Sequence, residues 1–124
     1  MTEHRRQLLD RTLFPEEHVL AEGRANWLRP VGMPSGGSTH HYLWLTDQRL
    51  VWGTIWGTHG PWTLPLDALT SFEERTFDGH RYLLTLRQPR VETTFAFSRR
   101  DTGLARALRI LLERLGVPNL APGV

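Results

Sequence analysis

The stretch HHYLWLTDQRLVWGTIW, residues 40–56, decides the fold. Two runs rich in apolar residues flank Asp47-Gln48, and a two-residue connection between such runs is typical of a β-hairpin. With this turn at the centre, Trp44 lies directly opposite Val51 on the neighbouring strand. The sequence therefore predicts two antiparallel strands in a defined register.

Side chains along a strand alternate between the two faces of a sheet, so this register sorts the hairpin residues into two sets. The leucine-rich set is the expected core face and comprises Leu43, Leu45, Leu50, Trp52, Thr54 and Trp56. The other set, called the outer hairpin face below, comprises Tyr42, Trp44, Val51 and Ile55. A contiguous apolar surface of this kind is unusual on a solvated monomer, so we expect something to cover it.

Three covers fit the outer hairpin face. A short helix is expected over residues 3–13, and it could fold back with its three leucines against this face. A second copy of the chain could pack there instead, or a different protein could do so. In the last two cases Tyr42 and Trp44 are the expected hot spots, because tyrosine and tryptophan concentrate binding energy at interfaces.

Five further runs have the composition of short strands separated by turn residues. In the second hairpin Asp78-Gly79 favours a type I′ turn. Pro65 favours an edge or the end of a strand, because proline has no backbone N–H to donate. The five runs cover residues 19–28, 62–66, 69–77, 80–86 and 91–97.

The last segment, residues 98–116, reads as an amphipathic helix. Ser98 and Asp101 have the spacing of a capping box at its start, and Gly116 suits a left-handed residue at its end. Residues 117–124 are expected to form a loosely ordered tail. The apolar stripe of this helix comprises Leu104, Leu108, Leu111 and Leu115, widened by Ala107 and Leu112.

The segments YLWLTDQRLVWG, LPLDALTSFEER and FAFSRRDTGLARALRILLERL resemble the GRAM and bacterial PH-like families. The matching positions are Thr46, Asp47, Arg49 and Leu50, then Pro65, Leu66, Leu69 and Phe72, then the helix over 104–115. The resemblance implies a mainly β (α+β) fold over residues 15–116. This is a PH-like, seven-stranded bent β-barrel or sandwich capped by the C-terminal amphipathic helix. The helix over residues 1–14 and the tail over 117–124 are additions to that pattern.

The resemblance also implies a non-catalytic binding module, because these families are known for binding. Contact with another protein or self-association, through the outer hairpin face or a rim of the barrel, is the first expectation. The alternative is peripheral membrane binding, with Arg29, Arg87 and Arg90 meeting at one rim to hold an anionic head group. Trp56 and Trp62 would then lie at the membrane interface, or would simply pack at the rim of the barrel. A barrel that binds a small ligand or a carbohydrate is the third reading.

The composition of the chain excludes several other classes of function. The 124 residues suggest one domain, and the absence of cysteine removes disulfides and thiolate chemistry. No nucleophile elbow, HExxH sequence or phosphate-binding glycine motif occurs, so neither an enzyme nor a metal or cofactor site is expected. The net charge of only +2 argues against nucleic acid as a partner. The absence of a signal peptide and of a long apolar run favours a cytoplasmic protein, and the exclusive use of arginine as the strong base suggests a bacterial one.

Overall fold

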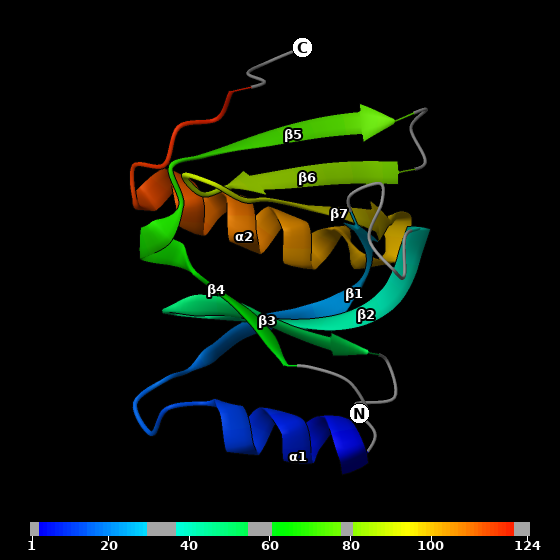
Figure 1. Cartoon of the computed structure of the whole chain (residues 1–124), viewed down its shortest axis with the longest axis vertical. Helices are drawn as coiled ribbons and strands as arrows, with labels where there is room; N and C mark the ends of the chain where they lie inside the picture. The colour runs from blue at the N-terminus through cyan, green and yellow to red at the C-terminus, as the bar shows by residue number, and fades with distance from the viewer. Residues whose placement is uncertain (1–2, 30–36, 55–60, 78–80, 121–124) are drawn as a thin grey trace.

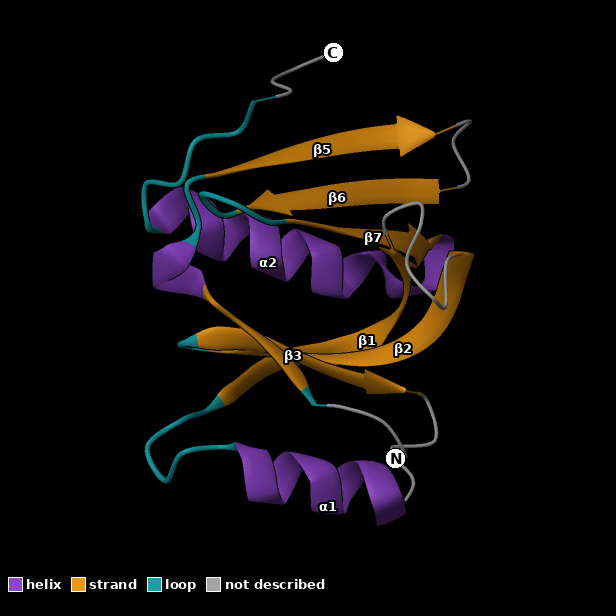
Figure 2. Ribbon diagram, in the orientation of Figure 1, coloured by secondary structure: helices purple, strands orange, loops and turns teal. Residues whose placement is uncertain are grey.

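The computed structural model describes residues 3–29, 37–54, 61–77 and 81–120 of the chain (Figure 1). These residues form two α-helices, seven strands and two short 3₁₀ turns (Figure 2). The helices are α1 (Glu3–Thr12) and α2 (Thr102–Arg114), and the 3₁₀ turns are Leu66–Ala68 and Arg99–Asp101. The strands are β1 (Val19–Arg29), β2 (Gly37–Thr46), β3 (Arg49–Thr54), β4 (Trp62–Pro65), β5 (Ser71–Phe77), β6 (Arg81–Arg87) and β7 (Glu92–Ser98).

The strands form one antiparallel sheet in the order β4-β3-β2-β1-β7-β6-β5. β1 pairs with β2 from Val19 to Arg29 but with β7 only at Asn26, Trp27 and Leu28. The sheet therefore bends at β1 into two layers, with β1–β4 in one and β5–β7 in the other (Figure 1). This is the PH-like β-sandwich that the sequence predicts.

The register predicted for the first hairpin is confirmed. Trp44 pairs with Val51 across β2 and β3, and Leu43 pairs with Trp52. The leucine-rich face points into the main core, which lies between the two layers and α2. Leu43, Leu45, Leu50 and Trp52 are buried there, whereas Thr54, at the end of β3, is half-buried. Ile55 and Trp56, which the sequence assigned to opposite faces of this hairpin, lie outside the described residues.

The start of α2 is tied to β1 and not closed by a capping box. The Asp101 carboxylate accepts one hydrogen bond from the backbone N–H of Arg24 and one from the Ser98 hydroxyl, each at 3.1 Å. The Ser98 side chain makes no capping bond to the helix, so the predicted capping box is wrong. Gly23 on β1 allows this close approach, because a Cβ there would lie 3.2 Å from Asp101 Oδ1.

The end of α2 follows the prediction. Gly116 has φ of 78°, its N–H donates to Glu113 O at 3.1 Å, and the Val117 N–H donates to Leu112 O at 3.0 Å. These two bonds are the Schellman arrangement that closes many helices. Leu115 was expected in the buried stripe, but it is 54% exposed at the C-cap position of α2.

The tail is held more firmly than the sequence predicts. Phe72 in β5 donates its N–H to Pro118 O at 2.9 Å and accepts at its carbonyl from the Leu120 N–H at 2.8 Å. The Asn119 side chain donates to Glu74 at 3.2 Å. The expectation of a loose tail from residue 117 is therefore wrong as far as residue 120, because the free edge of β5 supplies backbone partners.

The second hairpin differs in its connection. The Asp78-Gly79 turn itself lies outside the described residues, but β5 and β6 pair Phe77 with Arg81. A two-residue turn at Asp78-Gly79 would have paired Phe77 with His80 instead. β5 and β6 occur where the sequence predicts strands, but their register is displaced by one residue from the one that a two-residue turn would give.

Candidate binding surface

The outer hairpin face is covered by α1. Trp44 and Val51 are fully buried and form a small second cluster with Leu9 of α1, against which Leu13 and Tyr42 are half-buried. Figure 1 shows α1 on the outer side of the β1–β4 layer, whereas α2 lies on the inner side of that layer. The first of the three expected covers is thus the one present in this structure.

The hold of α1 on the sheet is thin. Among the α1 side chains that the structure describes, only Leu9 is buried, and burial of one leucine contributes about 1.5–3 kcal/mol. Fixing the backbone of each residue costs about 1–2 kcal/mol, and an isolated helix of ten residues is marginal in water. The helix therefore depends on docking for its own stability.

The buried indole of Trp44 has an unmet polar requirement. Its Nε1–H is buried and has no hydrogen-bond acceptor among the described residues. Leaving such a donor unpaired costs about 1–3 kcal/mol. The Tyr42 ring lies 5.2 Å from the Trp44 ring and is half-buried against the same cluster.

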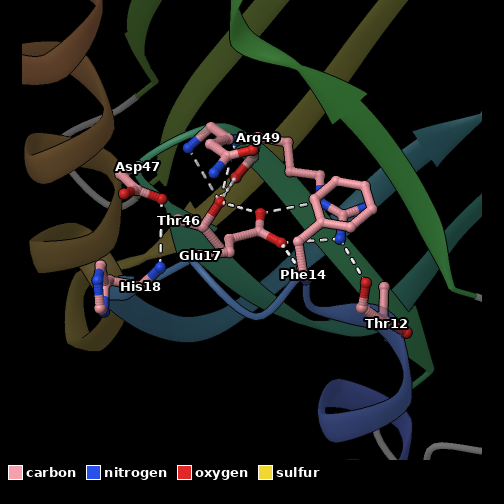
Figure 3. Close-up of polar contacts among 8 residues, drawn as sticks. Thr12, Phe14, Glu17, His18, Thr46, Asp47 and Arg49 are labelled. Carbon is pink, nitrogen blue, oxygen red and sulfur yellow. Dashed lines mark hydrogen bonds and ion pairs between the residues drawn. The ribbon is translucent and has the colours of Figure 1, made fainter.

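A polar cluster fastens the C-terminal end of α1 and the linker that follows (Figure 3). Arg49 binds both carboxylate oxygens of Glu17 at 2.8 Å, and its Nη2 also donates to the Thr12 carbonyl at 2.5 Å. The Thr46 hydroxyl donates to Glu17 at 2.5 Å, and the guanidinium carbon lies 4.4 Å from the centre of the Phe14 ring. We call these five residues the linker clasp.

The linker clasp keeps Glu17 ionised. Hydrogen bonds from Arg49 are the largest influence and lower the pKa of Glu17 to about 2. Bonds from Thr46 and the Phe14 backbone act in the same direction, while burial of the carboxylate opposes them. A bidentate guanidinium–carboxylate pair is the strongest geometry for such a contact.

The next residues continue this attachment to the β2–β3 turn. The His18 N–H donates to the Asp47 carboxylate at 3.2 Å, and the Asp47 N–H donates to the His18 carbonyl at 3.1 Å. Sequence reasoning singled out Arg49 only as a motif position and missed Glu17, because the two are far apart in the chain. α1 is thus pinned at its C-terminal end by polar contacts and further along mainly by Leu9.

Of the three arginines of the membrane reading, the structure describes the side chains of Arg87 and Arg90. Arg87 is already paired, with Glu73 at 3.1 Å and Glu92 at 3.0 Å, and the Arg87 bond lowers the pKa of Glu73. Arg90 is exposed in the loop after β6. The side chain of Arg29 lies outside the described residues. No helix among the described residues is long and apolar enough to cross a membrane.

Of the two rim tryptophans, Trp62 packs within the protein. Its ring lies 4.9 Å from that of Trp27 and 5.4 Å from that of His41, and it is half-buried against the main core. Trp27 also meets Trp52 edge to face at 5.4 Å. Trp56 lies outside the described residues. The described indoles therefore serve mainly to fill the sandwich and its second cluster.

Comparison with known proteins adds information on the fold. No family model matches the chain, and no curated protein matches it in sequence. Among solved structures, the C-terminal domain of an unknown protein from Leishmania infantum has a TM-score of 0.61 and 12% identity, covering 87% of this chain and 93% of that one. The hSac2 domain from human phosphoinositide phosphatase Sac2 has a TM-score of 0.59 and 14% identity, covering 96% of this chain and 88% of that one. At these identities the likeness concerns the fold alone, and it agrees with the topology in showing a PH-like β-sandwich fold.

Proposed function

We propose that this chain is a non-catalytic binding module whose contact surface for another protein is the outer hairpin face. The observation that carries the proposal is the contrast between this face and its cover. Trp44 and Val51 form an apolar surface of the kind found at interface hot spots, and Leu9 is the one buried side chain among those that the structure describes in the ten-residue helix over them. The resemblance of the sequence to GRAM and bacterial PH domains supports binding as the role.

In this proposal α1 opens as a separate unit. None of the α1 side chains that the structure describes belongs to the main core between the two layers, so in this proposal the sandwich keeps its packing when α1 leaves. Local units of low stability are where binding surfaces are commonly exposed. Once α1 has left, the outer hairpin face is free to contact a partner or a second copy.

The test is the substitution Leu9→Asp, which puts a charge into the cluster with Trp44 and Val51. We expect the sandwich to stay folded, with its near-ultraviolet circular dichroism retained, and the exposed face to give reversible, concentration-dependent association in sedimentation velocity. Gln7→Asp is the matched control, because it adds the same charge at an exposed position of α1 and should leave the chain monomeric. A Leu9→Asp chain that stays monomeric at every concentration, or that unfolds entirely, would contradict the proposed function.

A further inference from the structure

We propose that a cavity between α2 and β6 binds a small molecule that carries one carboxylate group. The cavity has a volume of about 250 Å³. The described residues that line it are Tyr82 of β6 and Thr102, Ala105, Arg106 and Arg109 of α2. None of these five residues lies in α1 or in the first hairpin, so the inference goes beyond the proposed function and stands without it.

The spacing of residues along α2 brings two guanidinium groups to this cavity. Arg106 and Arg109 are three residues apart, and positions three or four apart lie on the same face of a helix. Thr102 precedes Arg106 by four residues, and Ala105 precedes Arg109 by four. One face of α2 therefore supplies four of the five described lining residues, and Tyr82 lines the cavity from the sheet.

The Arg109 side chain has an unmet hydrogen-bonding requirement. Its Nε is buried and has no hydrogen-bond acceptor among the described residues. Its contacts with Glu113, 3.9 Å from Nε, and with Glu74, 3.6 Å from Nη1, are longer than hydrogen bonds. A guanidinium holds a carboxylate best through two parallel N–H···O bonds, so a ligand carboxylate would supply the acceptor that Nε lacks.

The neighbouring carboxylate of Glu74 is occupied by other donors. It accepts a hydrogen bond from the Tyr82 hydroxyl and another from the Asn119 side chain, at 3.2 Å for the latter. Glu74 is thus held by the sheet and the tail, while Arg109 is tied to it only loosely. A ligand that binds Arg109 would not have to break a hydrogen-bonded ion pair.

Arg106 supplies a second positive charge at the cavity. Its side chain is exposed and forms no ion pair with the residues that the structure describes. A carboxylate held by Arg109 would therefore have a second guanidinium on the same helix face to contact. Two arginines at one small site favour an anion over a neutral or cationic ligand.

The surroundings decide which anion fits. Glu74 and Glu113 both lie within 4 Å of Arg109, so a ligand with two negative charges would be repelled more than a ligand with one. The Tyr82 ring and the Ala105 methyl group add apolar walls. The cavity is smaller than the range of about 300–1,000 Å³ that is typical of ligand pockets, so the ligand is small. A monocarboxylate with a compact apolar body matches these features.

The test is a titration of benzoate into the full-length chain, followed by nuclear magnetic resonance. We expect benzoate to shift the Arg109 Nε–H and Ala105 amide resonances. Arg106→Gln and Arg109→Gln should each weaken binding about tenfold or more, because each removes a charged hydrogen-bond donor. Arg114→Gln is the matched control, because it removes the same charge from an exposed position of α2 that does not line the cavity.

Two further ligands test the chemical class. Benzamide has the shape of benzoate without its charge and should not bind, and inorganic phosphate should bind more weakly than benzoate. Benzamide binding as tightly as benzoate, or phosphate binding more tightly, would contradict a carboxylate site.

Three results with benzoate itself would overturn the inference. The first is that neither resonance moves, and the second is that Arg114→Gln weakens binding as much as Arg106→Gln does. The third is that the Arg106→Gln chain binds like the native one. Arg106→Gln decides the matter even if Arg109→Gln disturbs the fold, because the Arg106 side chain is exposed.

Discussion

Glu17 and Arg49 join two segments that the sequence separates widely, and their pairing is the main polar fastening of the α1 linker. The Glu17 side chain is fully buried and that of Arg49 is 12% exposed, so removal of either would leave the other buried without a partner of opposite charge. Breaking such a buried pair is typically strongly destabilising, by about 3–5 kcal/mol. Part of this loss is local here, because the pair lies outside the main core.

The pairing predicts a dependence of stability on pH. The pKa of Glu17 falls from 4.5 to about 2 on folding, which corresponds to about 3 kcal/mol of stability from the ionised form. Because the folded pKa is the lower one, this contribution is complete above about pH 4.5 and is lost as the pH falls toward 2. Urea unfolding of the native chain between pH 6 and pH 2 should show the loss.

The matched variants are Glu17→Gln and Glu16→Gln. The first should lower the free energy of unfolding at pH 7 by about 3 kcal/mol and flatten the dependence between pH 4.5 and pH 2. The second removes an exposed neighbouring carboxylate and should behave like the native chain. A Glu17→Gln chain with the native pH profile would show that the linker clasp does not hold the ionised carboxylate as described.

At the scale of elements, the two helices have different relations to the sandwich. α2 buries Leu104, Ala105, Leu108 and Leu112 in the main core, whereas α1 contributes Leu9 to a separate cluster. The difference arises from sequence, because α2 has an apolar stripe over its whole length and α1 alternates few leucines with charges. α2 is thus part of the fold, and α1 is an addition to it.

This difference predicts unequal costs for the same truncation in the two helices. Leu108→Ala should lower the free energy of unfolding by about 2–5 kcal/mol, because it opens a cavity in the main core. Leu9→Ala should cost less than about 1.5 kcal/mol, because the loss cannot exceed the docking free energy of α1 itself. Urea denaturation followed by far-ultraviolet circular dichroism measures both, and equal losses would mean that α1 unfolds only with the sandwich.

Local chemistry predicted some elements better than others. The Asp47-Gln48 turn and the alternation around it gave the correct register of β2 and β3, and Gly116 marked the end of α2. The pairing of residues 118–120 with β5 was not predictable, because it depends on a free strand edge that exists only in the folded chain. The sequence left three covers for the outer hairpin face open for the same reason. Composition shows that this face is apolar, but it does not show which segment or partner packs against it.

At the scale of the whole molecule, charge is balanced and locally paired. The net charge is +2, and Arg87 is engaged by Glu73 and Glu92. Such pairing weakens the attraction of an anionic membrane, which acts on free cations within a Debye length. We therefore expect no co-sedimentation of the chain with anionic vesicles at physiological salt.

The double variant Arg87→Ala with Arg90→Ala serves as the control for that experiment. If the native chain binds in a salt-sensitive way and this variant binds more weakly, peripheral membrane binding becomes the preferred function. Binding that both chains share would point to a surface away from these arginines.

The central claim is that α1 opens from the outer hairpin face while the sandwich stays folded, and native-state hydrogen exchange measures this most directly. The amides in the last turn of α1, ending at Thr12, should exchange through local opening with a free energy of about 2 kcal/mol or less. The amides of Leu43 and Leu45 in β2 should exchange only with global unfolding. If the α1 amides instead share the protection and the denaturant dependence of those in β2, α1 is an integral part of the fold and the outer hairpin face is not a binding surface.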